Sequence, residues 1–532
     1  MRSKLTLMLV AAALSVVSAA PAPTKSIALD AATIADLNAA FDAGALTAEK
    51  LVQMCLARIQ AYDRQGPSLH AVMTLNPKAI DTARQLDAER KAKGPRSPLH
   101  GIPVVLKDNY DTSDLPTTGG SVLLEGWIPP ADAFVVKKLR DAGAIVLAKV
   151  NMSEFASGGA HSSLGGQSLN PHDLTRTPSG SSGGTGVAIA AAYAPLGLGT
   201  DTGGSIRGPS TANGIVGLKP THGLLSRTGI IPLALTFDTG GPMARSVYDV
   251  AVALGVMAGV DPADAATAKS EGHVERDYTK FLKADALNGA RIGVARDFLG
   301  ADPDVDWVVE STLAAMRKGG ATVVDVRLPK WLLDTRRDFY NAIRFPEFAA
   351  QIKTYLAATG PAYPKNLQQL MDRAQQFPST RADGAGPNPS RWSMFTRELE
   401  SGSLDDYRYT SVKEHALPLI RAAVEGVFTA QKLDAIVYPT ASKRPGRISE
   451  SDGPTAGGPD FAANMANLTG FPDLIVPAGF TGDNLPVGVS FFGPAFSEPK
   501  LLSLGYSFEQ ATHARRLPVH TPLRPGDAVP GW

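Results

Sequence analysis

The sequence predicts an α/β fold built on a large, mixed and largely buried β-sheet whose two faces are covered by helices. Short apolar runs, typical of buried strands, alternate along the chain with stretches of helical hydrophobic spacing. Hydrophobic residues make up 44% of the 532 residues and charged residues 19%, so the chain can bury a large core. We expect residues 21–532 to form a single domain that follows a signal peptide over residues 1–20.

The first residues have the three parts of an export signal. The segment "MRSK" is basic, "LTLMLVAAALSVV" is apolar, and "SAAPAP" offers small residues for cleavage near Ala19 or Ala20. The apolar part is too short and ends too abruptly to cross a bilayer well, although a short anchor that stays attached is the alternative. We therefore expect a secreted or periplasmic protein without stable membrane insertion after cleavage.

The mature chain is predicted to begin with helices. Asp30 can cap a helix over residues 31–43, Thr47 can cap one over 48–62, and a third helical pattern runs from 77 to 92. The single cysteine, Cys55, stands among leucines and isoleucine at helical spacing, which indicates a buried thiol rather than a nucleophile.

Strands and helices alternate beyond residue 100. In "GIPVVLKDN" an apolar run ends in polar residues, which places Lys107 at or just past the end of a strand. Helical patterns cover residues 132–143, 184–194 and 497–516. The remaining expected strands cover residues 144–150, 195–200, 290–296, 321–328, 433–440, 473–480 and 486–493.

Composition and motifs argue against several classes of function. The formal net charge is +1, which gives no electrostatic reason to expect nucleic acid as a partner. No phosphate-binding G-x-x-x-x-G-K-[ST] motif occurs, and the nine histidines are scattered without metal-ligand spacing. We expect no nucleic-acid partner, no metal and no cofactor.

Two glycine–serine loops flank the helix expected over residues 184–194. The first, "TPSGSSGG", formally fits the G-x-S-x-G nucleophile elbow with Ser182 at its centre. That elbow needs a strand directly before it, whereas the preceding "NPHDLTRTP" carries two prolines and almost no apolar residues. The second loop, "TDTGGSIRG", follows an expected strand and places Ser205 directly after two glycines. Ser205 is therefore the better candidate nucleophile.

A nucleophilic serine needs a base, and none of the late histidines lies in a catalytic-looking loop. Lysine can serve if it is neutral, and burial with few counter-charges lowers its pKa. Lys107 is the candidate, with an ion pair to Asp108 as the alternative; we expect Asp108 to face away. The glycines before Ser205 would let backbone N–H groups converge on one substrate oxygen, as an oxyanion hole requires.

Taken together, these segments strongly resemble the amidase signature family. The resemblance rests on "SGSSGG" at 179–184, on "GTDTGGSIRGP" at 199–209 and on the lysine segment "PLHGIPVVLKDN". It continues through "NGIVGLKPTHGLLSRTGIIPL", "DTGGPMARSV", "LTGFPDLIVPAGF" and "LPVGVSFFGPAFSEPKLL", and so covers nearly the whole mature chain. It implies the amidase signature fold.

The resemblance also implies a role for each site residue. Lys107 would be the base, Ser181 a bridging serine that follows a cis peptide bond, and Ser205 the nucleophile. The oxyanion hole would be formed by the backbone N–H groups of Thr202, Gly203 and Gly204. Asp201 and Arg207 are expected to form an ion pair that braces the nucleophile loop. His222 stands where many family members carry tyrosine. Two placements of its side chain are left open: lining the pocket or packing on the surface.

The function that follows is hydrolysis of a small-molecule or peptide amide through an acyl-enzyme. One alternative is the glutamine-hydrolysing subunit of a transamidation complex, and another is an exported, non-catalytic binding protein on the same scaffold. The export signal favours a protein that works alone, so we expect no obligate protein partner. Specificity is expected to lie in residues 334–410 and in the loop 441–458.

Overall fold

A computed structural model describes residues 26–377, 388–448, 464–529 and 531. The expected signal peptide and most of the 441–458 loop lie outside these residues, so export stays a prediction. Within the described residues, no helix combines the length and apolar character needed to cross a membrane.

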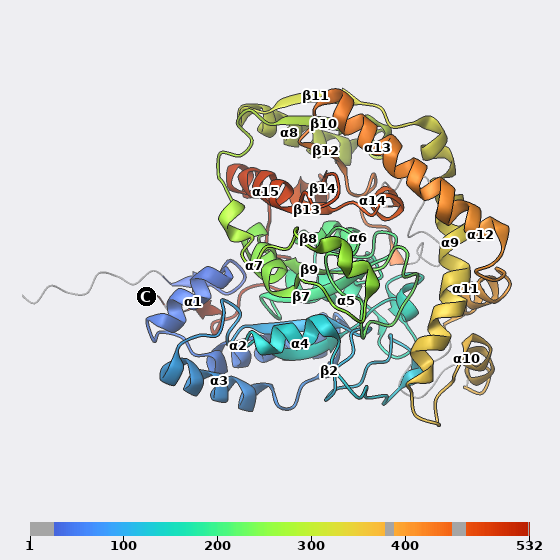
Figure 1. The fold of residues 1–532 in the computed structure, drawn as a ribbon. Helices are drawn as coiled ribbons and strands as arrows, with labels where there is room; N and C mark the ends of the chain where they lie inside the picture. The colour runs from blue at the N-terminus through green and yellow to red at the C-terminus, as the bar shows by residue number, and fades with distance from the viewer. Residues whose placement is uncertain (1–25, 378–387, 449–463, 530, 532) are drawn as a thin grey trace, which may run out of the picture.

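An eleven-stranded mixed sheet forms the centre of the molecule, seen nearly edge-on in Figure 1. The strand order is β11-β10-β12-β14-β13-β8-β9-β7-β3-β4-β2. In this order the strands cover Thr322–Val326, Arg291–Ala295, Ala435–Pro439, Pro486–Phe492, Asp473–Phe480, Val216–Lys219, Thr239–Ala244, Leu196–Asp201, Pro103–Lys107, Ile145–Val150 and Val72–Leu75. β10 runs parallel to β11 and β12, β3 runs parallel to β4 and β7, and the remaining neighbours are antiparallel.

Two short strand pairs lie outside the large sheet. β1 (Ile27–Ala28) pairs with β15 (Ala528–Val529), and β5 (His161–Ser162) pairs with β6 (Gly166–Gln167). The β1–β15 pair joins the first and last described segments of the chain. The helices cover Ile34–Asp42 (α1), Ala48–Ile59 (α2), Ala79–Lys93 (α3), Phe134–Asp141 (α4), Gly183–Ala190 (α5), Arg207–Ala212 (α6), Val247–Met257 (α7), Pro303–Lys318 (α8), Lys330–Ala357 (α9), Leu367–Ala374 (α10), Pro389–Leu399 (α11), Tyr407–Ser411 (α12), Leu417–Gln431 (α13), Asn464–Thr469 (α14) and Glu498–Thr512 (α15).

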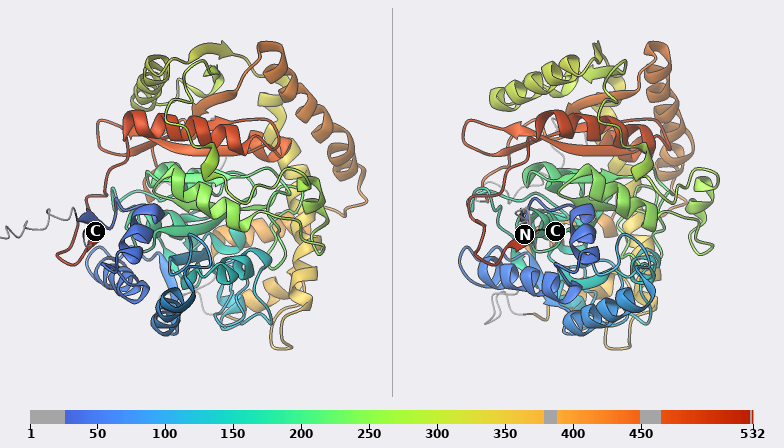
Figure 2. Two further views of the ribbon diagram at one scale, coloured as in Figure 1. Left: turned by 60° about the vertical axis from the view of Figure 1, so that its left-hand side comes forward. Right: turned by 90° about the vertical axis from the view of Figure 1, so that its left-hand side faces the viewer.

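Helices cover both faces of the sheet, as the sequence predicts. On one face α7 contacts α4 and α15 and packs on β7, β8 and β9, while α15 packs on β13 and β14. On the other face α5 contacts β3 and β7, and its neighbour α6 contacts β8, β13 and β14. The long helix α9 runs along one side of the molecule, past the levels of several strands (Figures 1 and 2).

Three strands of the sheet were not predicted from the sequence, the central strands β8 and β9 and the edge strand β2. β9 reads "TGGPMA", and glycine and proline are residue types that strands generally avoid. The glycine is needed, because a methyl group on Gly241 would lie 2.1 Å from the backbone oxygen of Leu218 in β8. Close approach of two strand backbones thus selects residues that local propensity counts against a strand.

One predicted helix cap is correct and another is wrong. Thr47 caps α2 by accepting a hydrogen bond from the Lys50 amide at 3.1 Å. α1 is capped by Thr33 rather than by Asp30, because Thr33 and Asp36 form a reciprocal capping box. Asp30 lies before the helix and forms an ion pair with Arg515 at 3.2 Å.

Helix α5, between the two glycine–serine loops, begins in direct contact with β4. The Gly184 amide donates to the Asn151 backbone oxygen at 3.0 Å, just past the end of β4. A methyl group on Gly184 would lie 2.3 Å from that oxygen and 2.8 Å from the Ala71 oxygen. The absence of a side chain at this position therefore fixes how closely α5 approaches the sheet.

We expect Gly184→Ala to destabilise the fold by about 1–3 kcal/mol or more, because the added methyl must displace backbone atoms. Gly426→Ala is the matched control, since Gly426 lies in α13 with no atom within 4 Å of the added methyl. That control should be neutral or stabilising by up to about 1 kcal/mol, because alanine favours a helix over glycine. Urea unfolding of both variants measures this difference, and equal effects would contradict the contact.

Candidate active site

Lys107 lies at the carboxyl end of β3, fully buried between β4 and β7. Its Nζ lies 2.6 Å from Ser181 Oγ and 2.7 Å from Thr200 Oγ1. Among the described residues, no carboxylate lies within ion-pair distance of this nitrogen. Burial lowers the pKa of Lys107 to about 7, against smaller opposing effects of Asp201 and Asp238. At neutral pH a large fraction of Lys107 is therefore uncharged.

Asp108 points away from Lys107, which confirms the expectation. Its carboxylate lies 3.4 Å from the Nζ of a different buried lysine, Lys149, and accepts hydrogen bonds from the amides of Thr118 and Gly120 at 3.1 Å. Two adjacent residues of "KDN" thus belong to separate networks, because successive side chains at the strand end diverge. This separation leaves Lys107 without a direct counter-ion.

Ser181 lies in the first glycine–serine loop, and the peptide bond between Gly180 and Ser181 is cis. Ser181 is buried, and its backbone oxygen accepts from the Ser153 amide at 3.0 Å. The neighbouring Ser182 amide donates to the Ser205 backbone oxygen at 3.1 Å, which joins the two loops directly. The structure therefore brings Lys107, Ser181 and the Ser205 loop to one place.

The hydroxyl of Ser182 faces the interior rather than a substrate. Ser182 is fully buried, and its Oγ donates to the Thr200 oxygen at 3.2 Å. No strand runs directly before it, since the preceding described strand is the two-residue β6. These features do not form a nucleophile elbow.

Ser205 is half-buried and lies between β7 and α6. Its hydroxyl makes no hydrogen bond to another described residue. Among the described residues, the amides of Thr202 and Gly203 are likewise without a backbone or side-chain acceptor. The Gly204 amide differs from expectation, because it donates to Asp201 Oδ1 at 2.9 Å. In this structure it holds the loop rather than pointing at a substrate oxygen.

The Asp201 carboxylate organises the nucleophile loop. Besides Gly204, it accepts hydrogen bonds from the Ile206 amide at 3.0 Å and from two nitrogens of Arg207, both at 3.1 Å. Burial alone would raise the pKa of Asp201, but the Arg207 guanidinium and these donors hold it well below its usual range. The predicted Asp201–Arg207 ion pair is confirmed, with both side chains fully buried.

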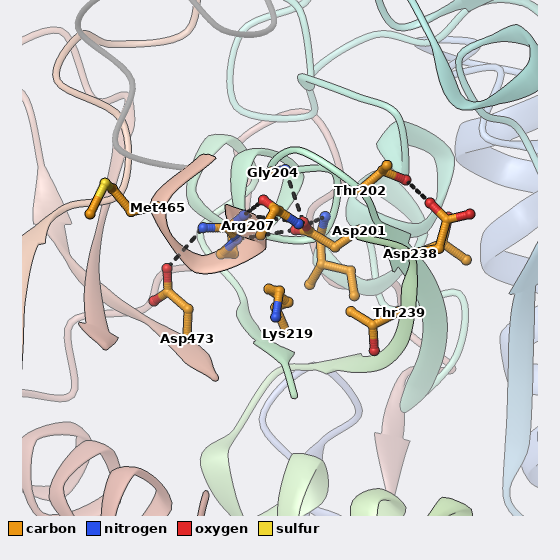
Figure 3. A network of polar contacts seen from close by, with 12 residues as sticks. Asp201, Thr202, Gly204, Arg207, Lys219, Asp238, Thr239, Met465 and Asp473 are labelled. Atoms are coloured by element: carbon orange, nitrogen blue, oxygen red, sulfur yellow. Dashed lines mark hydrogen bonds and ion pairs between the residues drawn. The ribbon is translucent and has the colours of Figure 1, made fainter. Parts of the chain in front are cut away.

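Arg207 also connects this loop to a distant part of the sheet. Its Nη1 lies 3.0 Å from Asp473 Oδ2 at the start of β13, and its Nη2 donates to Asn467 Oδ1 at 2.6 Å. Figure 3 shows Arg207 between the two aspartates. Asn467 in turn donates to Asp201 at 2.9 Å, which closes the network.

A small pocket lies beside the Lys107 contacts. Asn109, Thr200, Thr202 and Asp238 supply polar groups, and the segment 230–235 supplies apolar walls. Asp238 accepts from Thr202 Oγ1 at 2.5 Å, a contact drawn in Figure 3, and from the Leu233 amide at 2.8 Å. It therefore ties the loop before the nucleophile to the pocket wall.

Helix α9, from the region expected to govern specificity, reaches the nucleophile loop beside this pocket. A methyl group on Gly203 would lie 2.7 Å from the Tyr340 hydroxyl oxygen, and Tyr340 stacks on Phe237 at 5.3 Å between ring centroids. Residues 441–448 of the other expected specificity loop lie against the first serine loop, since the Thr177 amide donates to Gly446 at 3.0 Å.

Five residues of the site were not predicted from the sequence: Asn109, Thr200, Asp238, Tyr340 and Asp473. All of them except Tyr340 stood within the quoted motifs, and Asn109 and Thr200 were open to discovery as polar residues at strand ends. Asp238, Tyr340 and Asp473 reach the site through tertiary contacts, which the order of residues does not show. His222, whose place was left open, lies beside Arg227, and burial followed by the Arg227 charge lowers its pKa to about 3.

A family model described as Amidase matches residues 50–502. The chain belongs to the amidase family. This amidase is 37% identical over 495 residues to a Cupriavidus metallidurans protein named as a subunit of glutamyl-tRNA(Gln) amidotransferase, a match that covers 90% of this chain and 96% of that one. It also resembles the crystal structure of native peptide amidase from Stenotrophomonas maltophilia, with a TM-score of 0.84, 38% identity, and coverage of 92% and 99%.

A third likeness is to the corresponding glutamyl-tRNA(Gln) amidotransferase subunit of Thermotoga maritima, with a TM-score of 0.70, 27% identity, and coverage of 92% and 98%. The amidase signature fold is thus confirmed, and the chain is an amide-hydrolysing enzyme rather than a non-catalytic binding protein. The expectation that no obligate protein partner exists is wrong, because relatives of this kind are named as one subunit of an amidotransferase.

Metal chemistry was not expected from the sequence. In the part of the chain that the structure describes, His, Cys, Asp and Glu side chains do not gather in groups of three that could hold a metal ion. The expectation that the amidase needs no metal or cofactor stays a prediction.

We expect Arg207→Met to destabilise the amidase by about 3–5 kcal/mol, because it leaves two buried carboxylates without their cation. Arg84→Met is the matched control, since Arg84 is 57% exposed and pairs with Glu49 at the surface. The control should lose at most about 1 kcal/mol. Denaturant unfolding checks the difference, and similar losses in the two variants would show that the buried network contributes little.

Proposed function

We propose that this amidase hydrolyses carboxylic or peptide amides, with Ser205 as nucleophile, Ser181 as proton relay and Lys107 as base. The observation that carries the proposal is the 2.6 Å contact between Lys107 Nζ and Ser181 Oγ. It joins a buried lysine that lacks a carboxylate partner among the described residues to the serine beside the nucleophile loop. A neutral amine in that place can accept a proton, which an ion-paired lysine could not do.

The proposed reaction begins with two linked proton transfers. Ser181 passes its proton to neutral Lys107 and accepts the proton of Ser205, whose Oγ attacks the carbonyl carbon. The proton then returns through Ser181 to the leaving nitrogen as the C–N bond breaks and an ester to Ser205 remains. Water attacks that ester by the same proton path and releases the acid. Protonating the nitrogen matters because an amide anion is a poor leaving group.

The oxyanion that develops would be held by the amides of Thr202 and Gly203. Both are free of other acceptors within the described residues, and both directly precede the nucleophile turn. Gly204 takes a different part from the one expected, because its amide is bound to Asp201. Tyr340 over Gly203 and Asp238 on Thr202 keep these two amides in place from the outside.

The likeness to peptide amidase favours the C-terminal amide of peptides as substrate. The apolar walls of the pocket, Ile230, Ile231, Leu233 and Leu235, suit the side chain or body of such a substrate better than a charged one. A hydrolysis screen over aliphatic, aryl and peptide amides tests the substrate class. If the amidase hydrolysed none of these amides, the proposal would be excluded.

The second candidate is release of ammonia from glutamine as one subunit of an amidotransferase. The identity of 37% over 90% of this chain to a protein named as an amidotransferase subunit favours it. In that case glutamine hydrolysis should depend on a protein partner, recovered by co-purification from the source cells. Turnover of simple amides by the isolated chain, with no glutaminase activity in any complex, would decide for the first candidate.

Ser205→Ala should abolish turnover and labelling by a fluorophosphonate probe while leaving the fold intact, because the half-buried hydroxyl makes no hydrogen bond that supports the loop. Ser113→Ala, an exposed serine, is the control and should label as the wild type does. If labelling instead disappears in Ser182→Ala and persists in Ser205→Ala, the nucleophile has been misassigned.

The rate of amide hydrolysis should rise with pH through about 7, because the neutral form of Lys107 grows as pH passes its pKa. Lys107→Ala should remove this limb and reduce kcat/KM on an amide by about 100-fold or more. A matched ester should suffer less, since an alkoxide leaves without a proton more readily. pH–rate profiles of both substrates measure this, and an unchanged amide profile in the variant would exclude Lys107 as the base.

A further inference from the structure

A second, wider hollow lies directly beside the catalytic pocket. It has a volume of about 370 Å³ and shares Arg227 and Leu235 with that pocket, so these two residues form the wall between them. We call it the basic groove. Its sides come from the segment 235–236, from α9, from the start of α13 and from the short helix Ala265–Ser270. A volume of this size accommodates a small organic molecule.

The basic groove is lined by four cationic side chains and one carboxylate. The cations are Arg227, Lys269, Lys413 and Arg421, and the carboxylate is Glu347. Two of the cations are already paired. Arg227 binds Asp264 through Nε at 2.8 Å and through Nη2, and Lys413 lies 3.3 Å from Glu347 Oε1. Glu347 is itself fully buried and also accepts from the Thr236 amide at 2.9 Å. The Glu347 carboxylate is therefore already bound by groups of the groove wall.

Lys269 and Arg421 remain without a carboxylate partner among the described residues. Arg421 donates through Nε to the Thr469 backbone oxygen at 2.9 Å, which fixes its guanidinium at the groove but leaves its charge uncompensated. Burial lowers the pKa of Lys269, and the nearby positive charges of Arg421 and Arg227 lower it further. His222, also in the lining, is uncharged at neutral pH and adds no positive charge.

Beside these cations the groove has an apolar surface. Leu235, Leu417 and Pro418 supply it, while the side-chain amide nitrogen of Gln351 adds a hydrogen-bond donor. Two uncompensated cations held near each other are stabilised by an anion between them, and in a hollow with low-dielectric walls that attraction exceeds its value on an open surface. The apolar surface favours an anion that carries a hydrocarbon part over a bare inorganic ion.

We propose that the basic groove is a binding site for an organic anion, in which Lys269 and Arg421 hold a carboxylate or phosphate group while Leu235, Leu417 and Pro418 contact its apolar body. The shared wall places this ligand next to the catalytic pocket. The anionic group can belong to a remote part of the amide substrate or to a separate small molecule, and the same side chains recognise it in either case.

Calorimetric titration with phenyl phosphate at low salt and pH 7 tests the site. The wild type should bind one equivalent, and Lys269→Gln combined with Arg421→Gln should weaken binding at least tenfold. Lys91→Gln combined with Lys93→Gln removes the same charge from the exposed end of α3 and should change the affinity less than twofold. Both pairs of residues are exposed, so we expect both double variants to unfold at the temperature of the wild type. That result would show that the variants are folded.

Absence of saturable binding to the wild type, or equal loss in both double variants, would overturn the proposal. A kinetic comparison separates the two sources of the anion, using a peptide amide that contains Glu and its Gln counterpart. If the substrate supplies the anion, the groove variant should lose at least fivefold in kcat/KM on the Glu peptide alone. If a separate molecule does, both peptides should respond alike, while phenyl phosphate binding still depends on Lys269 and Arg421.

Discussion

The arrangement of the catalytic side of this amidase depends on one buried guanidinium. Arg207 lies between Asp201 and Asp473, with ion-pair distances of 3.1 and 3.0 Å, and all three side chains are fully buried. Asp201 uses its remaining acceptor sites to hold the Gly204 and Ile206 amides. Removing one partner from a buried ion pair is strongly destabilising, so this network holds the loop that carries Ser205 in place. The strain-tolerant glycines of the loop would otherwise leave it free to move.

The second constraint is the isolation of Lys107. A buried lysine usually finds a carboxylate, and its own neighbour Asp108 is turned toward Lys149 instead. Lys107 is left with the hydroxyls of Ser181 and Thr200, at 2.6 and 2.7 Å, and burial then favours its neutral form. Stability and reactivity are coupled here, because the ion pair that satisfies Asp108 is also what keeps Lys107 available to accept a proton.

Helix α9 links the catalytic pocket to the basic groove. Tyr340 lies over Gly203, Glu347 holds the Thr236 amide, and Gln351 accepts from the Leu235 amide at 2.9 Å. The segment 235–236 is thus held from the groove side and faces the catalytic pocket on the other. Variation in α9 would alter both hollows at once, and a role of this part of the chain in specificity stays a prediction.

The sequence by itself determined the family, the α/β class and the two serine loops, because these depend on contiguous motifs in which residue order carries the chemistry. It also placed Lys107 at a strand end and paired Asp201 with Arg207, six residues apart. Only the tertiary structure decided the rest. Asp473 meets Arg207 across 266 residues of chain, and Asp238, Tyr340 and the groove cations arrive from separate elements, so the sequence does not show which residues they meet. Even β9 was hidden, since close packing of its backbone requires the glycines that local propensity counts against a strand. The order of residues determines local chemistry, whereas a pocket is formed by side chains from distant segments that meet only in the folded protein.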